Sequence, residues 1–292
     1  MSRDISFVIP CLNEGGNVQR TVESIERCQP GDYEIIVVDN GSTDGCTSFM
    51  SGSTGPRRRL IRYDLRLGVA GARNVGAAFA EGDLLVFCDA HVLFGQPQLE
   101  PLLAPLRAGA AGIVGPSVSA WGNPHARGYG MFWTDSALGA DWLGQRANEP
   151  YPVPLLAGLC QAFRAQAFFD LGGYDPGMTG YGHEDVEICL RSWLCGLPVL
   201  VVPETEVSHL FRRAAPYEID WKDNVYNMLR LAYVHFGVQR IERVLEHLSK
   251  LPGFDEAVQQ LNASEVWLRR RMFEWRRQNT DDWFFGQFEM AV

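Results

Sequence analysis

The sequence has no hydrophobic run long enough to cross a membrane, since none approaches the roughly 18–20 apolar residues that a spanning helix needs. Its N-terminus leads straight into a strand pattern and shows no signal peptide. The seven cysteines are scattered and include no CxxC pair, so their spacing favours neither a zinc knuckle nor a disulfide framework. From these absences we expect a reduced, cytoplasmic location.

An excess of positive charge is also missing, because the net charge is −9 at pH 7. This balance argues against binding of nucleic acid through bulk electrostatics. No G-x-G-x-x-G segment follows the first expected strand and no P-loop is present, so the usual marks of dehydrogenases and kinase-like NTPases are lacking. What is present is an ordinary globular composition with 46% hydrophobic residues, which is enough for a substantial core.

Strands that alternate with helices and are apolar on both faces predict an α/β fold with a mostly parallel sheet flanked by helices. The long aromatic segment 122–154 is expected to be a loop that carries or covers a site. Expected strands lie at 5–10, 34–38, 60–63, 84–88, 113–118, 155–163 and 197–202, and expected helices at 18–28 and 69–80.

We divide the chain into a domain over residues 1–219 and a C-terminal helical extension over residues 220–292. Within the first domain, residues up to about 92 form the expected nucleotide-binding half, and residues 93–219 the acceptor and catalytic half.

A candidate metal site follows the expected strand at 84–88, where ligands gather at the carboxyl ends of parallel strands. Asp89 and His91 supply oxygen and nitrogen ligands, which suit manganese or a similar ion that could neutralise a diphosphate leaving group. His209, after another apolar strand, is a third candidate ligand only together with this pair. The alternative is a turn aspartate, a surface histidine and a packed or capping histidine.

Two adjacent acids, Glu184 and Asp185, stand at the start of an expected amphipathic helix. One carboxylate could bind a sugar hydroxyl while the other removes a proton from the acceptor. Glycines just before them, including Gly182, permit a close approach of the backbone to a ligand. The alternative is that the acids only favour the positive N-terminal end of the helix dipole.

Arg73 lies in an expected helix of small residues at 69–80, which could pack close to the sheet. The N-terminus of this helix could face a phosphate group. The alternative is a well-packed Ala/Gly helix with one exposed arginine.

Taken in order, these segments resemble glycosyltransferase family 2 and its relatives of the GT-A fold. The run ISFVIPCLNE at 5–14 resembles that family's opening strand, and IIVVDNGSTD at 35–44 resembles its second strand and nucleotide-binding turn. Residues 71–76, followed by 83–91, resemble its Arg-Asn helix and metal-binding strand. The resemblance implies a Rossmann-like GT-A domain with a nucleotide-sugar donor.

The second half, at 155–212, is more similar to one branch, the polypeptide N-acetylgalactosaminyltransferases. Asp-x-His in place of Asp-x-Asp, a later Val-x-His-x-Phe-Arg, and an Asn-x-x-Arg at Asn227 and Arg230 are all habits of that branch. The likeness covers residues 5 to 235.

The resemblance also implies roles for the matching residues. Asp39 would hold the base of the nucleotide, with Pro10 and Glu14 lining the same pocket and Arg73 near the ribose or phosphates. The remaining implied roles are metal binding for Asp89, His91 and His209, contact with the donor sugar or acceptor for Gly158, Gly182 and Glu184, and closure of a mobile loop over the diphosphate for Arg212, Arg213 and Tyr217.

One departure from the branch concerns the reaction. The branch has Asn after the Glu and retains anomeric configuration, whereas this chain has Asp185, as inverting family 2 enzymes do. Because direct displacement needs a base opposite the leaving group, we expect Asp185 to be that base and the reaction to invert. A retaining enzyme with the same donor site, and a non-catalytic nucleotide-sugar-binding protein, are the alternatives. The second departure is the lack of a lectin domain, Golgi anchor or transmembrane bundle, from which we expect a compact catalytic unit.

The tail segment 265–278 reads as a helix with Leu268, Met272 and Trp275 on one face and five arginines around it. Such a helix could lie on an anionic membrane or make a homodimer contact, and the alternative is a helix packed on the domain. The sequence as a whole predicts a glycosyltransferase that uses Mn²⁺ or Mg²⁺ and a nucleotide diphosphate sugar, with UDP expected. The acceptor hydroxyl or thiol could belong to a peptide, glycan, lipid or small molecule.

Overall fold

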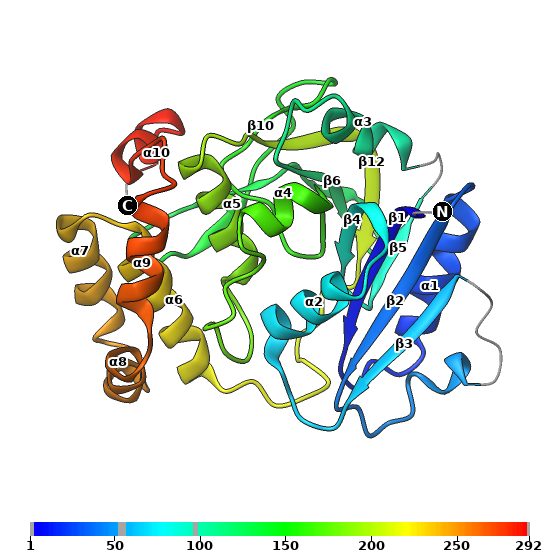
Figure 1. Cartoon of the computed structure of the whole chain (residues 1–292), viewed down its shortest axis with the longest axis horizontal. Coiled ribbons are helices and arrows are strands. Elements are labelled where there is room, and N and C mark those ends of the chain that lie inside the picture. Colours follow the sequence, from blue (N-terminus) through cyan, green and yellow to red (C-terminus); the bar gives the residue numbers. More distant parts are fainter. Residues whose placement is uncertain (1–2, 52–56, 96–98, 291–292) are drawn as a thin grey trace.

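A ten-stranded mixed sheet runs through the part of the chain that the computed structural model describes, residues 3–51, 57–95 and 99–290 (Figure 1). Its strand order is β10-β12-β6-β11-β4-β1-β2-β3, with β5 paired to β12 and β7 to β6. The four strands from β4 to β3 are all parallel, and they are β1 (Arg3–Cys11), β2 (Tyr33–Asn40), β3 (Arg58–Tyr63) and β4 (Gly82–Cys88).

The other half of the sheet mixes directions. Strand β11 (Cys160–Arg164) is antiparallel to both β4 and β6 (Ile113–Ala120), whereas β12 (Val199–His209) runs parallel to β6. The shorter strands are β5 (Val92–Phe94), β7 (Asn123–Gly128) and β10 (Tyr151–Pro152), and β8 (Met131–Trp133) pairs with β9 (Ala140–Trp142) in a separate two-stranded sheet. The predicted α/β class with a mostly parallel sheet is confirmed.

Successive side chains of a strand point to opposite faces of the sheet. Because these strands are apolar throughout most of their length, both faces of the sheet are apolar, and helices cover each of them. Phe7 belongs to the core cluster that holds α1 (Asn17–Cys28) and α3 (Glu100–Arg107), while its neighbour Val8 belongs to the cluster on the other face. That second cluster includes residues of α2 (Gly68–Ala78), α4 (Ala165–Asp170) and α5 (Glu184–Leu194).

Gly76 sets how closely α2 packs on the sheet. A Cβ atom at this position would lie 2.2 Å from Cγ1 of Val8 and 3.1 Å from Cγ2 of Val38. Only glycine allows this approach, which confirms the prediction that small residues bring the helix against the sheet.

The tail consists of helices that pack on the second face, at the left of Figure 1. They are α6 (Trp221–His235), α7 (Val238–Leu248), α8 (Phe254–Ala263), α9 (Val266–Glu274) and α10 (Asp281–Gln287). Elsewhere, a 3₁₀ turn, η1 (Ser48–Met50), lies between β2 and β3. Phe284 and Phe285 of α10 are buried, and the ring of Phe285 stacks on Trp133 at 5.8 Å. The terminal aromatic residues therefore anchor the tail.

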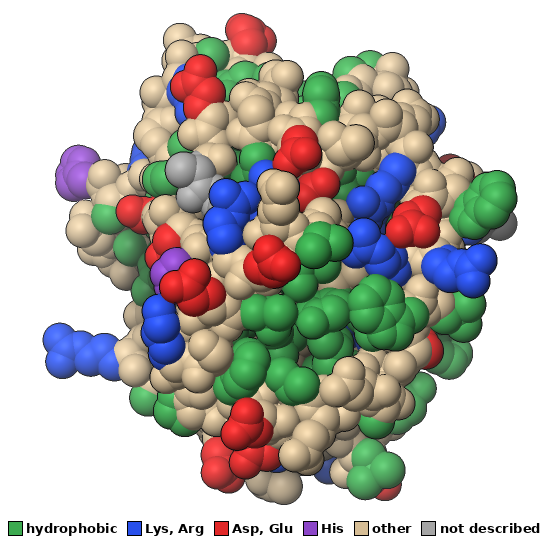
Figure 2. All heavy atoms as spheres, turned by 90° about the vertical axis from the view of Figure 1, so that its left-hand side faces the viewer, with side chains coloured by type: hydrophobic (Ala, Val, Ile, Leu, Met, Phe, Trp, Pro, Cys, Tyr) green, Lys and Arg blue, Asp and Glu red, His purple; other side chains and the backbone are tan. Residues whose placement is uncertain are grey.

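Helix α9 turns the face with Leu268, Met272 and Trp275 outward, with Trp275 88% exposed. It packs instead through Val266, Arg269 and Phe273, and so the predicted apolar face is real but does not hold the helix. On the side of the molecule turned toward the viewer in Figure 2, hydrophobic side chains gather among charged ones. The predicted membrane or homodimer contact stays a prediction, and no helix among the described residues is long and apolar enough to cross a membrane.

Several predicted bounds were wrong. Of the strand predicted at 155–163, only residues 160–163 lie in a strand, β11. Leu155 makes an isolated bridge to Met131, and the backbone of Gly158, in the turn before β11, binds the side chains of Arg73 and Asp185 instead of a neighbouring strand. The strand predicted to end at 202 continues to His209 through an irregularity between Val202 and Glu206 that accommodates Pro203. The loop predicted at 122–154 holds four short strands, and helices α3 and α4 were not predicted.

Candidate active site

A cleft of about 1180 Å³ opens where β1 and β4 end. Segments far apart in sequence form its walls, including the first turn of α5 and the chain that follows β12. Nearly all of the predicted site residues line it: Pro10, Glu14, Arg73, Asp89, His91, Gly158, Gly182, Glu184, Asp185, His209, Arg212, Arg213 and Tyr217.

Asp39 is the exception, since it is fully buried beside the cleft rather than in its lining. Its Oδ1 accepts the backbone N–H of Ser42 at 2.8 Å, and its Oδ2 accepts the hydroxyl of Thr47 at 3.0 Å. In this structure the carboxylate therefore shapes the loop after β2. Its predicted contact with the nucleotide base stays a prediction.

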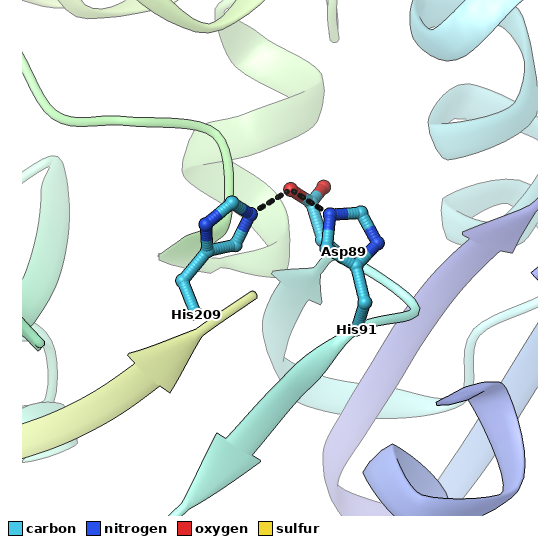
Figure 3. Close-up of side chains that lie close together, drawn as sticks. All are labelled: Asp89, His91 and His209. Carbon is cyan, nitrogen blue, oxygen red and sulfur yellow. Dashed lines mark ion pairs between the residues drawn. The ribbon is translucent and has the colours of Figure 1, made fainter. Parts of the chain in front are cut away.

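Asp89, His91 and His209 offer one ligand atom each, all within 4.8 Å of one another (Figure 3). Nε2 of His209 lies 3.5 Å from Oδ2 of Asp89, and Nε2 of His91 lies 3.9 Å from the same oxygen. One carboxylate and two imidazoles form a donor set that fits Mn²⁺ or a similar divalent ion. The residues present therefore suit the metal that the sequence predicts.

Strand pairing brings the distant histidine to this site. Asp89 and His91 lie in the short turn between β4 and β5, and β5 pairs with β12 so that Val92 lies opposite His209. The backbone N–H of Asp89 donates to the carbonyl of Leu159 at 3.1 Å, which holds the turn in place. The register of β12 thus sets His209 next to His91.

The charges around Asp89 favour its ionised form. Burial alone would raise its pKa, but the hydrogen bond from His209 and the charges of His91 and Arg73 hold the pKa of Asp89 well below its usual range. A carboxylate kept ionised in this way is ready to bind a cation over the whole physiological pH range.

Arg73 joins the metal side of the cleft to the acidic pair. Its side chain is almost fully buried, and its guanidinium lies 3.2 Å from Asp89, 3.0 Å from Glu184 and 2.7 Å from the carbonyl of Gly158. The alternative prediction, that Arg73 is exposed, is therefore wrong. Burial and the neighbouring Asp185 raise the pKa of Glu184 to about 7, and Arg73 opposes the shift.

Asp185 has different partners from those of Glu184. Its Oδ2 accepts the backbone N–H of Gly158 at 2.7 Å and its Oδ1 that of Val186 at 2.8 Å. Its own carbonyl accepts a hydrogen bond from the amide of Gln161 at 3.2 Å. These contacts orient the carboxylate at the wall of the cleft, where each oxygen keeps a further lone pair for a substrate hydroxyl.

Two supporting residues had not been singled out from the sequence. Gln161 is fully buried on β11, and its Oε1 accepts the hydroxyl of Tyr174 at 2.9 Å. The backbone N–H of Tyr174 donates to Oδ1 of Asn74, and its carbonyl accepts from Nδ2 of Asn74. The available signal was a polar residue inside an apolar strand, because such a group is buried only when it is hydrogen-bonded.

The chain after β12 reaches across the cleft. The guanidinium of Arg212 pairs with both carboxylate oxygens of Glu14, with an Nη1–Oε1 distance of 3.2 Å. Burial and the charges of Asp89 and Glu14 raise the pKa of Tyr217 to about 12, so its hydroxyl stays protonated. Arg213 is exposed on the same loop. The predicted loop thus lies over the candidate metal site.

Sequence comparison places these residues within known protein families. The family described as glycosyl transferase family 2 matches residues 6–171, and the N-terminal domain of galactosyltransferase matches residues 144–213. The chain is 32% identical to polypeptide N-acetylgalactosaminyltransferase 11 of Xenopus tropicalis over 78% of its own length and 42% of the relative. It is 31% identical to polypeptide N-acetylgalactosaminyltransferase 10 of Homo sapiens over 73% of its length and 39% of the relative. The chain therefore spans about two fifths of these curated relatives.

Solved structures show a similar fold. GalNAc-T7, crystallised with UDP, GalNAc and Mn²⁺, superposes with a TM-score of 0.80 at 24% identity, over 99% of this chain and 57% of that one. Residues 1–349 of TarS from S. aureus superpose with a TM-score of 0.56 at 15% identity, over 92% of this chain and 72% of that one. At these identities the likeness concerns the fold, and it includes the C-terminal helices in the first case.

Proposed function

This chain belongs to glycosyl transferase family 2, and from that premise we propose that it transfers a sugar from a UDP-sugar to an acceptor hydroxyl or thiol. The observation that carries the proposal is one cleft that holds both the Asp89-His91-His209 cluster and the acidic pair at the start of α5. A cation site and a candidate base on the walls of a single cleft are what metal-assisted displacement of a nucleoside diphosphate requires. The complex of GalNAc-T7 with UDP and Mn²⁺ supports the choice of nucleotide and metal.

In this proposal the residues of the cleft have separate roles. Asp89, His91 and His209 would hold Mn²⁺ or Mg²⁺, which supplies positive charge to the diphosphate leaving group. Arg212, Arg213 and Tyr217 add donors from the loop above it.

Asp185 takes the proton of the acceptor. Its carboxylate is oriented by the backbone N–H groups of Gly158 and Val186, so it can face the acceptor without a change of rotamer. Glu184 is held by Arg73 below the cleft surface and instead supports the donor-sugar side. Direct displacement assisted by Asp185 gives inversion of the anomeric centre.

The acceptor class remains open among peptides, glycans, lipids and small metabolites. A peptide with serine and threonine hydroxyls is the first acceptor to screen, because the curated relatives are named polypeptide transferases. The anomeric configuration of the product, read by proton NMR, separates an inverting reaction from a retaining one. The cytoplasmic location predicted from the sequence stays a prediction.

Calorimetric titration of UDP into the protein, with and without Mn²⁺, tests the donor site. We expect binding that depends on the metal and that Asp89→Ala removes. Asp83→Ala, which replaces an exposed acid near the start of β4, the strand that Asp89 follows, should leave it unchanged. Absence of UDP binding with any metal would contradict the donor assignment, and GDP and dTDP would be tried next.

A further inference from the structure

Glu14 faces the candidate metal site from an unexpected side. The family resemblance implied that it lines the nucleotide pocket. It does line the cleft, but its side chain is only 4% exposed and lies against His91 and Arg212. Its Oε1 is 3.2 Å from Nδ1 of His91. Figure 3 shows that His91 turns one ring nitrogen toward Asp89 and the other away from it.

The two ring nitrogens of His91 therefore have separate partners. Nε2 is the nitrogen that lies 3.9 Å from Asp89 Oδ2, so it is the one available to a cation. Nδ1 is the nitrogen near the Glu14 carboxylate. A carboxylate next to Nδ1 favours the neutral tautomer with the proton on Nδ1, and this tautomer leaves the lone pair of Nε2 free for a metal.

The same carboxylate also binds the loop. The two terminal guanidinium nitrogens of Arg212, Nη1 and Nη2, pair with Glu14, 198 residues away in sequence. Glu14 thus contacts a candidate metal ligand with one oxygen while it anchors the loop arginine with both.

We propose that Glu14 is a positioning residue that orients His91 for metal binding and ties the Arg212 loop to the metal site. This inference rests on the metal site of the proposed function. Carboxylates that hold a ligating histidine in this way typically contribute 10- to 100-fold to metal affinity. Glu14 itself need not touch the metal or the donor.

The test is a calorimetric titration of Mn²⁺ into the protein, with and without UDP. We expect Glu14→Ala to weaken Mn²⁺ binding by roughly 10- to 100-fold. Glu14→Gln should weaken it less, because an amide oxygen remains available as an acceptor facing Nδ1 of His91, but by more than threefold. Glu81→Gln, which removes one exposed negative charge at the opposite end of β4 from Asp89, is the matched control and should change nothing.

A second readout uses the metal-free protein. Nitrogen NMR of the imidazole rings, with the His91 signal assigned through His91→Gln, should show the proton on Nδ1 in the wild type. In Glu14→Ala the proton should appear on Nε2 as well. A residue that only supported the fold would leave this tautomer unchanged.

The outcomes are distinguishable. Wild-type protein that binds no Mn²⁺ with or without UDP would contradict the proposed metal-dependent function. Wild-type binding that stays within threefold in Glu14→Gln and in a folded Glu14→Ala would overturn the role of Glu14 alone. Should Glu14→Ala fail to fold, the affinity and tautomer of Glu14→Gln decide the question.

Discussion

Arg73 and Glu184, 111 residues apart in sequence, form an ion pair with an Nη1–Oε1 distance of 3.0 Å beneath the cleft. Their side chains are 2% and 7% exposed. This pair connects α2, on the nucleotide side of the fold, to the first turn of α5, which carries the candidate base. Arg73 reaches Asp89 as well, so one cation serves three parts of the site.

Loss of this arginine should be costly to the fold. Arg73→Met leaves Glu184 and Asp89 without their buried partner, and breaking a buried pair from one side costs about 3–5 kcal/mol. Arg58→Met, which breaks a pair with Glu26 whose members are 24% and 30% exposed, should cost less than about 1 kcal/mol. Urea denaturation measures both, and equal costs would show that the buried pair contributes nothing special.

Asp185→Asn tests the chemistry separately from donor binding. The amide oxygen can still accept the N–H of Gly158, but the amide NH2 group then replaces the oxygen that accepts the N–H of Val186, so donor binding must be measured beside the rate. A lost general base lowers the rate by roughly 100-fold or more. Release of UDP from a UDP-sugar in the presence of the screened acceptor reports the rate, and UDP titration reports the donor site. Unchanged turnover would mean that Asp185 is not the base.

A methyl group at Gly158 should disturb both partners of this turn. Its Cβ would lie 2.8 Å from Nη1 of Arg73 and 2.9 Å from Cβ of Asp185, closer than unstrained carbon contacts allow. We expect Gly158→Ala to lower transfer by at least tenfold, since small displacements of reacting groups are costly. Gly144→Ala is the control, because nothing lies within 4 Å of its Cβ. Equal rates for the two variants would contradict the geometry.

Acid should destabilise the protein through His235. Burial lowers its pKa from 6.5 to about 4, although the hydrogen bond to Glu187 opposes the shift. The unfolded chain takes up this proton near pH 6.5 and the folded chain only near pH 4. The contribution of His235 to the free energy of unfolding is therefore fully present above pH 6.5. As the pH falls from 6.5 to 4, the free energy of unfolding decreases by about 3 kcal/mol. In His235→Gln, which keeps a hydrogen-bond donor for Glu187, the free energy of unfolding should fall less across this window. A slope equal to that of the wild type would refute the assignment.

Elements with strong local patterns could be predicted from the sequence alone. Residues 5–10, 34–38 and 84–88 are short, mostly apolar runs, and each lies within a central parallel strand. The proximity of Asp89 and His91 could also be predicted, because two residues in one short turn lie close together in any fold. Phe284 and Phe285 are buried and anchor the tail, since burial of large apolar rings is favourable.

Which distant residues join these elements depends on how the whole chain folds. His209 reaches the site through the register of β12 on β5, and Arg73 is buried because Glu184 and Asp89 arrive to pair with it. The side chain of Asp39 accepts a hydrogen bond from its own loop. Helix α9 packs through Val266, Arg269 and Phe273 rather than through the apolar face predicted from the sequence. The physical reason is the same in each case. A buried charge or a packed face is stable only with a partner, and the partner comes from a segment that no local pattern specifies.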